Sequence, residues 1–435
     1  MGLVEKIVKQ QREYFEKNRD KNRKVESCVE TSDYPGGLYL NPEGNCDFKP
    51  SYMIFNDIDQ LKEMCVPDEL ATVHGSGNLN LNLKGWNRGK EICETEQLSV
   101  LEKADICRAF QQYVYGNSKY AESYRDILNQ MYFDKPMLIP VYDCGKMVVK
   151  KGTPLVLGSK KEPCISVSYD ELIVEEGGEI IAGGDCMVNA NRLSSASGST
   201  FSIGVNGTDA TDEEGRAQDG GRGNDAVAGN DGKDSCDVSA KDGTRGENGA
   251  NGANGKNGTS GTDGANVTYK ISRMEGIHYV FSYGGNGGNG AKAKDGGNGG
   301  SGGDAAKATS YCSKGRPGFG GSGGAGGNGG NGGDGANGGR VEIHYDQSES
   351  PDAEIRLLTP EEAQELKKVC GKGGLGGRGG MKGLGGTGGR DFDSSGKLVP
   401  SESKYNGVDG CNGENGTPGA PGLPGDIYIN GLLIS

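Results

Sequence analysis

The spacing of apolar residues in residues 1–136 predicts two kinds of element. Side chains at three- and four-residue spacing indicate an amphipathic helix over 3–24 and a helical hairpin over 100–131 that breaks at Gly116-Asn117. Leucines that alternate with asparagines over 78–83 indicate a half-buried strand. Pro136 closes this part, which we assign to a mixed α/β N-terminal domain. The stripe of the first helix comprises Val4, Ile7, Val8, Gln11 and Phe15.

Residues 137–210 follow a different pattern. Short β-rich runs succeed one another from 137–142 to 201–205, and turn residues such as Gly177-Gly178 separate them. Strands this short and evenly spaced are typical of a sandwich, a barrel or a β-solenoid. We favour a solenoid-like stack, because the segment that follows is itself a repeat.

Glycine dominates residues 211–435. The chain has 81 glycines in 435 residues, and from about residue 220 onward glycine recurs at every third position. Three residues per turn is the period of the polyproline-II helix, whose backbone groups bond only to neighbours or to water. We therefore predict a multidomain chain that ends in a bundle of about six such rods, with inserted strands and one short helix. The tracts lie at 220–232, 243–264, 284–302, 320–338, 371–389 and 407–425.

The residues between the glycines predict where each tract lies. Gly-Gly-x tracts at 284–303, 320–339 and 371–390 have two bare faces per turn, so we expect them inside the bundle. Gly-x-y tracts at 243–266 and 407–427 have one bare face, so we expect them at its edge. Regular polar columns either recognise a repetitive partner or solvate the bundle and cap free backbone groups. One such column comprises Asn248, Asn251, Asn254 and Asn257.

The linkers between the tracts are predicted to be ordered. Strands at 267–271 and 277–283 flank an expected turn at Glu275-Gly276, and 341–345 is a further strand. A capping box with proline at the first helical position starts a helix at Thr359-Pro360, which we expect to run to Cys370.

The six tracts resemble polyglycine-II proteins of two kinds. These are the glycine-rich antifreeze proteins of snow fleas and the glycine-rich adhesins at the tail-fibre tips of some phages. The resemblance covers about 220–427 and implies a compact bundle, with either an ice-binding face or receptor-binding loops at the rod ends. Ordered insertions separate the tracts here, and residues 1–205 carry no such resemblance. Collagen is a competing architecture, but only 416–424 has the proline content that it requires.

Charge and targeting signals exclude several classes of protein. The chain carries 47 basic and 60 acidic residues, a net charge of -13, which argues against binding to nucleic acid. No run approaches the roughly 18 apolar residues of a membrane span, and the N-terminus lacks the apolar region of a signal peptide. We expect synthesis in the cytosol, with assembly into a particle or surface structure as one later route.

Few residues carry recognisable chemistry. The twelve cysteines form no C-x-x-C pair and the chain has three histidines, so we expect mostly free thiols and no zinc site. One nonapeptide, 220–228, fits a calcium-binding β-roll, but such sites need tandem copies. We identify no catalytic, cofactor-binding or metal-binding residue and expect no cofactor. A non-enzymatic structural or adhesive protein is the favoured interpretation, and an enzyme with an unrecognised N-terminal site is an alternative.

Aromatic and cationic side chains mark two linkers at the expected rod ends. Loops on rigid scaffolds commonly carry recognition, so we predict binding of a protein or a cell-surface glycan there. These residues are Tyr311, Arg316, Phe319 and Tyr405. They could instead only cap the rod ends. An ice-binding protein would rely on a column that contains Thr244, Thr259 and Thr262. The helix over 3–24 is either a docking or oligomerising arm or a surface helix packed on its own domain.

Overall fold

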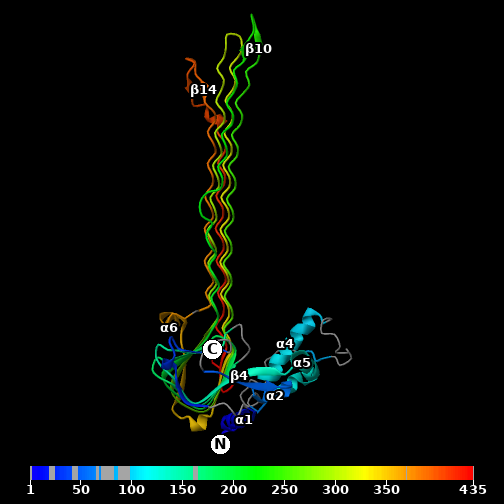
Figure 1. Ribbon diagram of the computed structural model, residues 1–435, viewed down its shortest axis with the longest axis vertical. Coiled ribbons are helices and arrows are strands. Elements are labelled where there is room, and N and C mark those ends of the chain that lie inside the picture. The colour runs from blue at the N-terminus through cyan, green and yellow to red at the C-terminus, as the bar shows by residue number, and fades with distance from the viewer. Residues whose placement is uncertain are drawn as a thin grey trace.

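The protein consists of a base of strands and helices from which a long, narrow shaft extends, and both chain termini lie at the base (Figure 1). The computed structural model describes residues 2–18, 25–41, 48–64, 68–69, 83–86, 98–159, 165–368 and 370–434. The base is mixed α/β with a large, mostly parallel sheet. Within the described residues, no helix is long and apolar enough to cross a bilayer.

Six strands form the main parallel row of the sheet. They pair in the order β4 (Met137–Val149), β6 (Ile165–Val174), β8 (Cys186–Ile203), β11 (Val267–Tyr283), β12 (Val341–Tyr345) and β16 (Ile427–Ile429). The strands from β11 onward lie in the part of the chain where the sequence predicts the glycine bundle. The sheet therefore runs through the glycine-rich half as well as through 137–210.

A second parallel row begins where the long strands bend. The first half of β8 pairs with β6, whereas its second half pairs with β7 (Glu179–Ala182). In the same way, β13 (Ala353–Leu357) pairs with the second half of β11. The row continues from β7 through β5 (Leu155–Leu157) to β2 (Leu38–Leu40). Each long strand is thus one bent coil of a solenoid-like stack.

The bend in β11 corrects one prediction. The sequence predicts two strands around a turn at Glu275-Gly276, but β11 is continuous across these residues. Gly276 has a φ of +80°, and a Cβ there would lie 2.1 Å from the Ser195 carbonyl oxygen of β8. Glycine is required because it alone adopts this conformation so close to a neighbouring strand. The residue makes a corner in a coil and not a hairpin.

The space between the two rows is the apolar core. Inward-facing residues alternate along each strand, and aromatic side chains such as Tyr142, Tyr169 and Tyr269 fill it. Burying one large aliphatic side chain in this way contributes roughly 1.5–3 kcal/mol. Three further strands complete the sheet: β1 (Glu26–Glu30), β3 (Ser51–Phe55) and β17 (Leu432–Leu433).

Helices form a lobe with a second core against the N-terminal strands. Its helices are α2 (Ile58–Met64), α4 (Val100–Tyr115) and α5 (Arg125–Tyr132), with a 3-10 helix over Ser118–Tyr124. A capping box between Ser99 and Glu102 starts α4. The predicted helical hairpin matches these elements. The predicted strand over 78–83 lies almost wholly outside the described residues.

The first helix, α1 (Leu3–Asn18), packs on the base, mainly against β11 and β8. Its predicted stripe is buried, and Val8 is completely enclosed. Residues 19–24 of the predicted helix lie outside the described residues. Because the stripe packs on its own chain, it is not free to serve as a docking arm.

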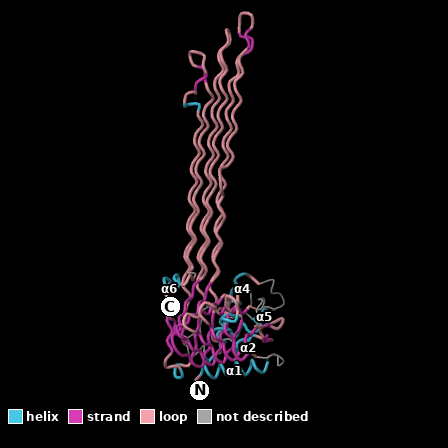
Figure 2. The backbone as a smooth tube through the Cα atoms, turned by 60° about the vertical axis from the view of Figure 1, so that its left-hand side comes forward, coloured by secondary structure: helices cyan, strands magenta, loops and turns pink. Residues whose placement is uncertain are grey.

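The shaft consists of extended, glycine-rich segments that run along one another (Figure 2). Backbone hydrogen bonds join six such segments in the described part of the chain, and we call them rods 1–6. Backbone hydrogen bonds between rods recur at every third residue, and odd-numbered rods run opposite to even-numbered rods. Rods 1, 3 and 5 bond side by side in one layer, and rods 2, 4 and 6 form the other. The rods span 204–226, 243–264, 284–305, 318–339, 371–390 and 407–425.

Each pair of rods is an insertion between coils of the solenoid. Rod 1 continues β8 and rod 2 leads into β11, while rod 3 continues β11 and rod 4 leads into β12. Rod 5 follows α6 (Pro360–Glu365), and rod 6 leads into β16. α6 has the predicted capping box but ends five residues before Cys370. The parallel register of the coils thereby places the rods side by side.

The structure corrects the predicted course of two rods. Rod 1 begins at 204 and not at 220, with Ala210, Glu213 and Ala217 in place of glycine. The spacing from Glu213 to Ala217 contains one extra residue, beside Gly215 at a φ of +81°. Rods 3 and 4 bond to four other rods each, as predicted for the interior, but rod 5 bonds to only three and borders an open edge.

Candidate functional site

The loops that join the rods far from the base form the tip of the shaft (Figure 1). They carry two short hairpins, β9 (Asn230–Asp231) with β10 (Cys236–Val238), and β14 (Asp391–Phe392) with β15 (Leu398–Val399). The four predicted recognition residues all belong to this tip. The structure brings Phe319 and Tyr405 into contact, and it places Tyr311 and Arg316 on the loop between rods 3 and 4.

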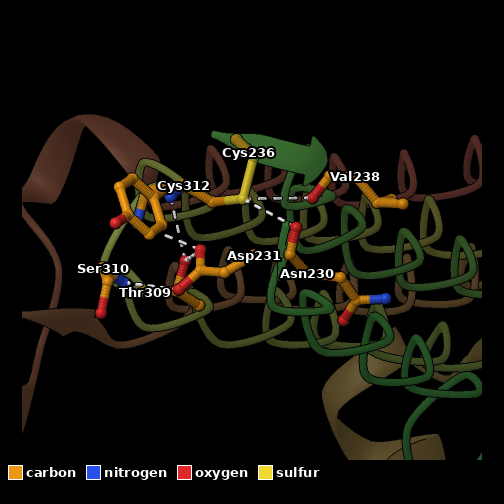
Figure 3. Close-up of a disulfide and its surroundings, with 8 residues drawn as sticks. Asn230, Asp231, Cys236, Val238, Thr309, Ser310 and Cys312 are labelled. Atoms are coloured by element: carbon orange, nitrogen blue, oxygen red, sulfur yellow. Dashed lines mark hydrogen bonds between the residues drawn. A yellow bond between two sulfur atoms is a disulfide. The ribbon is translucent and has the colours of Figure 1, made fainter. Parts of the chain in front are cut away.

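Tyr311 lies on a loop that a disulfide fixes. Cys236 and Cys312 are bonded, and the carboxylate of Asp231 accepts hydrogen bonds from the backbone of Ser310 at 2.9 Å and of Tyr311 at 3.1 Å (Figure 3). A hydrogen bond from the Thr309 hydroxyl to this carboxylate lowers the pKa of Asp231. The Tyr311 side chain remains 52% exposed. The loop therefore presents an exposed ring from a restrained backbone.

This disulfide was not predicted from the spacing of the cysteines. Six other cysteines in the described residues are free: Cys28, Cys107, Cys144, Cys186, Cys370 and Cys411. Cys46, Cys65, Cys93 and Cys164 lie outside the described residues. Burial raises the pKa of the Cys144 and Cys186 thiols, so neither is a reactive thiolate.

Phe319 and Tyr405 form an aromatic pair at the start of rods 4 and 6. Their ring centroids lie 5.0 Å apart, and Phe319 is 51% exposed. The Lys404 ammonium lies 5.3 Å from the Tyr405 ring centroid. The hydrogen bond to Glu402 raises the pKa of Lys404, and the charge of Arg316, which lies at the same end of the shaft, acts in the opposite sense. We call Phe319, Tyr405, Lys404 and Arg316 the tip patch.

Ion pairs that the sequence reasoning missed hold the ends of the rods together. Asp304 at the end of rod 3 pairs with Arg390 of rod 5 at 2.6 Å and with Arg222 of rod 1 at 3.2 Å. The hydrogen bond from Arg390 lowers the pKa of Asp304. Lys314 pairs with Asp391 at 2.8 Å and joins two tip loops. Only the shared register of the rods brings these residues together, so sequence spacing alone gave no signal for them.

The polar columns cap backbone groups between the rods of a layer. Asn251 accepts a hydrogen bond from the Ala325 backbone at 2.9 Å, and Asn254 accepts one from the Asn328 backbone at 2.8 Å. In the opposite direction, Gly252 donates to the Ala325 carbonyl at 2.8 Å. Each turn of these rods therefore makes two hydrogen bonds to its neighbour in the layer. Of the two interpretations left open, capping matches this geometry.

The threonine column lies at the edge formed by rods 1 and 2. The Thr262 hydroxyl accepts a hydrogen bond from the Val205 backbone at 2.8 Å, and Thr259 accepts one from the Thr208 backbone at 2.7 Å. Thr244 accepts one from the Asn224 backbone at 2.6 Å, closer to the tip. Glu247 and Lys256 interrupt the column between them. These hydroxyls fasten rod 1 to rod 2.

A buried histidine of the base, His278, belongs to a network of hydroxyl groups. His278 lies between the hydroxyls of Ser195 at 3.0 Å and Thr200 at 2.8 Å. Because Ser195 donates to the Ile277 carbonyl, His278 Nδ1 donates to Ser195 and Nε2 accepts from Thr200. Burial lowers the pKa of His278 to about 4, and the ring is 1% exposed. A serine and a histidine meet here, but no substrate can reach them.

No family model, curated protein or solved structure matches this chain. The described residues also contain no group of three or more side chains that could hold a metal ion. In the nonapeptide 220–228, Asp225 bonds to the Asp304 backbone at 2.8 Å and pairs with Arg222. The tip is therefore the place where exposed aromatic and cationic side chains gather on a restrained framework.

Proposed function

We propose that this protein is a non-enzymatic display protein, in which a polyglycine-II bundle holds a recognition tip away from an anchoring base. The observation that carries the proposal is the position of the tip patch at the end of the shaft opposite to both termini (Figure 1). A rod of about 20 residues in this conformation spans roughly 60 Å. The shaft would keep the tip clear of whatever surface holds the base.

The hydrogen-bond pattern supports a stiff shaft. In rod 4, Gly321 donates to rod 3 at 2.8 Å while Gly320 donates to rod 6 at 2.8 Å, so successive residues are tied to different neighbours. A flexible glycine linker would instead leave these groups to water. Bending the shaft would break many such bonds at once, which favours a rigid spacer.

The chemistry of the tip patch supports recognition of a surface ligand. Phe319 and Tyr405 offer an apolar face, Arg316 adds a cation at the same end of the shaft, and Lys404 pairs with Glu402 at 2.7 Å. Aromatic residues and arginine supply much of the binding energy in compact interfaces. An acidic cell-surface glycan fits this combination, and an acidic patch on a protein is the alternative that the experiment must separate.

The test is binding of the full chain to an array of acidic and neutral glycans and to whole cells. Phe319→Ala with Arg316→Ala should reduce binding at least tenfold, because these changes remove the apolar face and one cation. The matched control is Val205→Ala with Lys256→Ala, two exposed residues away from the tip, which should bind normally. Binding to cells that survives removal of surface glycans would identify a protein ligand. Binding that is unchanged by the patch variant would reject the recognition role of the patch.

An ice-binding role remains the alternative function. The shaft does present a threonine column, but its hydroxyls accept backbone hydrogen bonds, and charged residues interrupt it. Thermal hysteresis of the wild-type chain that Thr259→Lys with Thr262→Lys abolishes would favour this role over display.

A further inference from the structure

Exposed apolar side chains of the shaft concentrate at one edge. Rods 1–4 carry few of them between base and tip, whereas rods 5 and 6 carry five that are more than half exposed. These five are Leu375, Met381, Leu384, Val408 and Leu423. Rods 5 and 6 are the last pair of the bundle, so no further rod of this chain covers them.

The same edge continues down to an uncovered end of the base. Rod 6 leads into β16, and β17 follows it as the last strand of the sheet. The side chains of Leu432 and Leu433 in β17 are 71% and 55% exposed. At the other end of the sheet, the helical lobe packs against the N-terminal strands. Stacked coils expose apolar surface at any end that lacks a cap.

Charge also differs between the two rods of this edge. Rod 5 carries Lys372, Arg378, Lys382 and Arg390 and no acidic residue, whereas rod 6 carries Asp409 and Glu414 and no basic residue. Within the described part of the chain, Arg378 and Glu414 take part in no ion pair, and both are exposed. Rod 5 of one molecule is therefore complementary in charge to rod 6 of another.

We propose that two copies of this chain pair in parallel along the edge of rods 5 and 6, about a twofold axis that runs along the shaft. This inference does not depend on what the tip binds. A rotation about such an axis preserves height, so each residue of rod 5 meets the residue of the partner's rod 6 that lies at its own level. The interface is isologous and closes as a dimer.

The hydrogen bonds between rods 5 and 6 fix these levels. Gly416 donates to Gly377 and Gly413 donates to Gly380, so Arg378 and Met381 lie one residue from the levels of Glu414 and Cys411. Gly410 donates to Gly383 and Gly407 to Gly386, so Leu384 lies one residue from the level of Val408. A partner related by the twofold axis thus brings Glu414 near Arg378, and two apolar pairs, Met381 with Cys411 and Leu384 with Val408, follow toward the tip.

Three prolines reduce the number of backbone N–H donors that rod 6 exposes along this edge. Pro418, Pro421 and Pro424 occupy the positions equivalent to Asn412 and Asn415 along the lower half of rod 6. Asn412 and Asn415 bond to the backbone of Lys382 and Gly379 across the edge at 2.9 and 3.0 Å. Proline has no backbone N–H, so these three residues of rod 6 present no donor of their own when a partner covers them.

The first test measures the mass of the full chain by sedimentation equilibrium. We expect a dimer of the 45.3 kDa chain at micromolar concentration. Arg378→Glu alone and Glu414→Arg alone should each weaken dimerisation at least tenfold, and the double variant should restore it because the pair is merely exchanged. Lys256→Glu, at the opposite edge, should leave the dimer unchanged. A monomeric wild-type chain would overturn the proposal, as would an oligomer that ignores both single reversals.

A second test asks directly whether position 381 of rod 5 lies next to Cys411 in rod 6 of the partner subunit. Met381→Cys should form a disulfide with Cys411 of the partner subunit under mild oxidation, which gives a covalent dimer on a non-reducing gel. Cys411→Ser in the same background should abolish that dimer. Cross-linking that persists without Cys411, or that does not exceed the wild-type level, would contradict the proposed register.

Discussion

In the base, side chains such as Val188, Tyr269 and Ile271 are enclosed almost completely, whereas rods 3 and 4 at the centre of the shaft enclose little besides backbone. The base is held by apolar burial, and the shaft by hydrogen bonds between glycines that approach too closely for any Cβ. The two regions nevertheless share one register, because each pair of rods is inserted between paired strands. The comparison teaches that a chain with little apolar content can be ordered when a conventional sheet sets the spacing of its rods.

The largest effect is expected for a side chain added inside the shaft. A Cβ at Gly329 would lie 2.1 Å from the Gly377 carbonyl oxygen, which belongs to the backbone and cannot move aside. Gly329→Val should therefore cost about 3 kcal/mol, at the upper end of the range for overpacking. Calorimetry should show a lowered shaft transition and an unchanged base transition. An unchanged shaft transition would mean that rods 4 and 5 do not pack as described.

Replacing one valine by alanine in each region should lower the free energy of unfolding much more in the base than in the shaft. Val188 in β8 is 1% exposed, and Val205 at the start of rod 1 is 58% exposed. Val188→Ala should cost about 2–3 kcal/mol of unfolding free energy, because it removes two buried methyl groups and leaves a cavity. Val205→Ala should cost less than about 0.5 kcal/mol. Chemical denaturation measures both, and similar costs would contradict the contrast.

Acid should weaken the base through His278. Burial lowers its pKa to about 4, so between its usual value of 6.5 and pH 4 the unfolded chain binds a proton that the folded chain does not. Stability therefore falls as pH falls through this window, by about 2 kcal/mol at pH 5 relative to pH 8. His278→Gln should flatten that part of the curve for the base. A curve that is equally steep in the variant would assign the loss to other groups.

The smallest effect is expected for one bond of the polar columns. Asn331 is exposed in rod 4 and accepts a hydrogen bond from the Thr417 backbone at 3.0 Å. Asn331→Val keeps rod 4 as it is and removes only this acceptor, so it should cost about 1 kcal/mol. It is also the matched control for Gly329→Val, because the same side chain is added two residues away. A cost as large as that of Gly329→Val would mean that the columns, and not the glycines, hold the shaft.

The three-residue period of glycine predicted rods 2–6. At each of these glycines the backbone of the next rod lies so close that a Cβ would not fit. The period missed the first half of rod 1, where Ala210 and Glu213 replace glycine in a rod that bonds to only two others. The pairing of β8 with β11 was not predictable, since two rods separate them in sequence. At the tip, composition pointed to Phe319 and Tyr405, but their contact and the disulfide of Cys312 depend on how the rods align.

Hydrogen exchange in rod 4 tests most directly whether backbone bonds hold the shaft. Every glycine amide from Gly320 to Gly330 on this rod donates to rod 3 or rod 6 at 2.8–3.0 Å. Peptides that cover 320–339 should therefore exchange as slowly as peptides from β11, while the tip loop at 393–397 exchanges quickly. Complete exchange of 320–339 within seconds, with β11 still protected, would show that the glycine tracts are not bonded to one another.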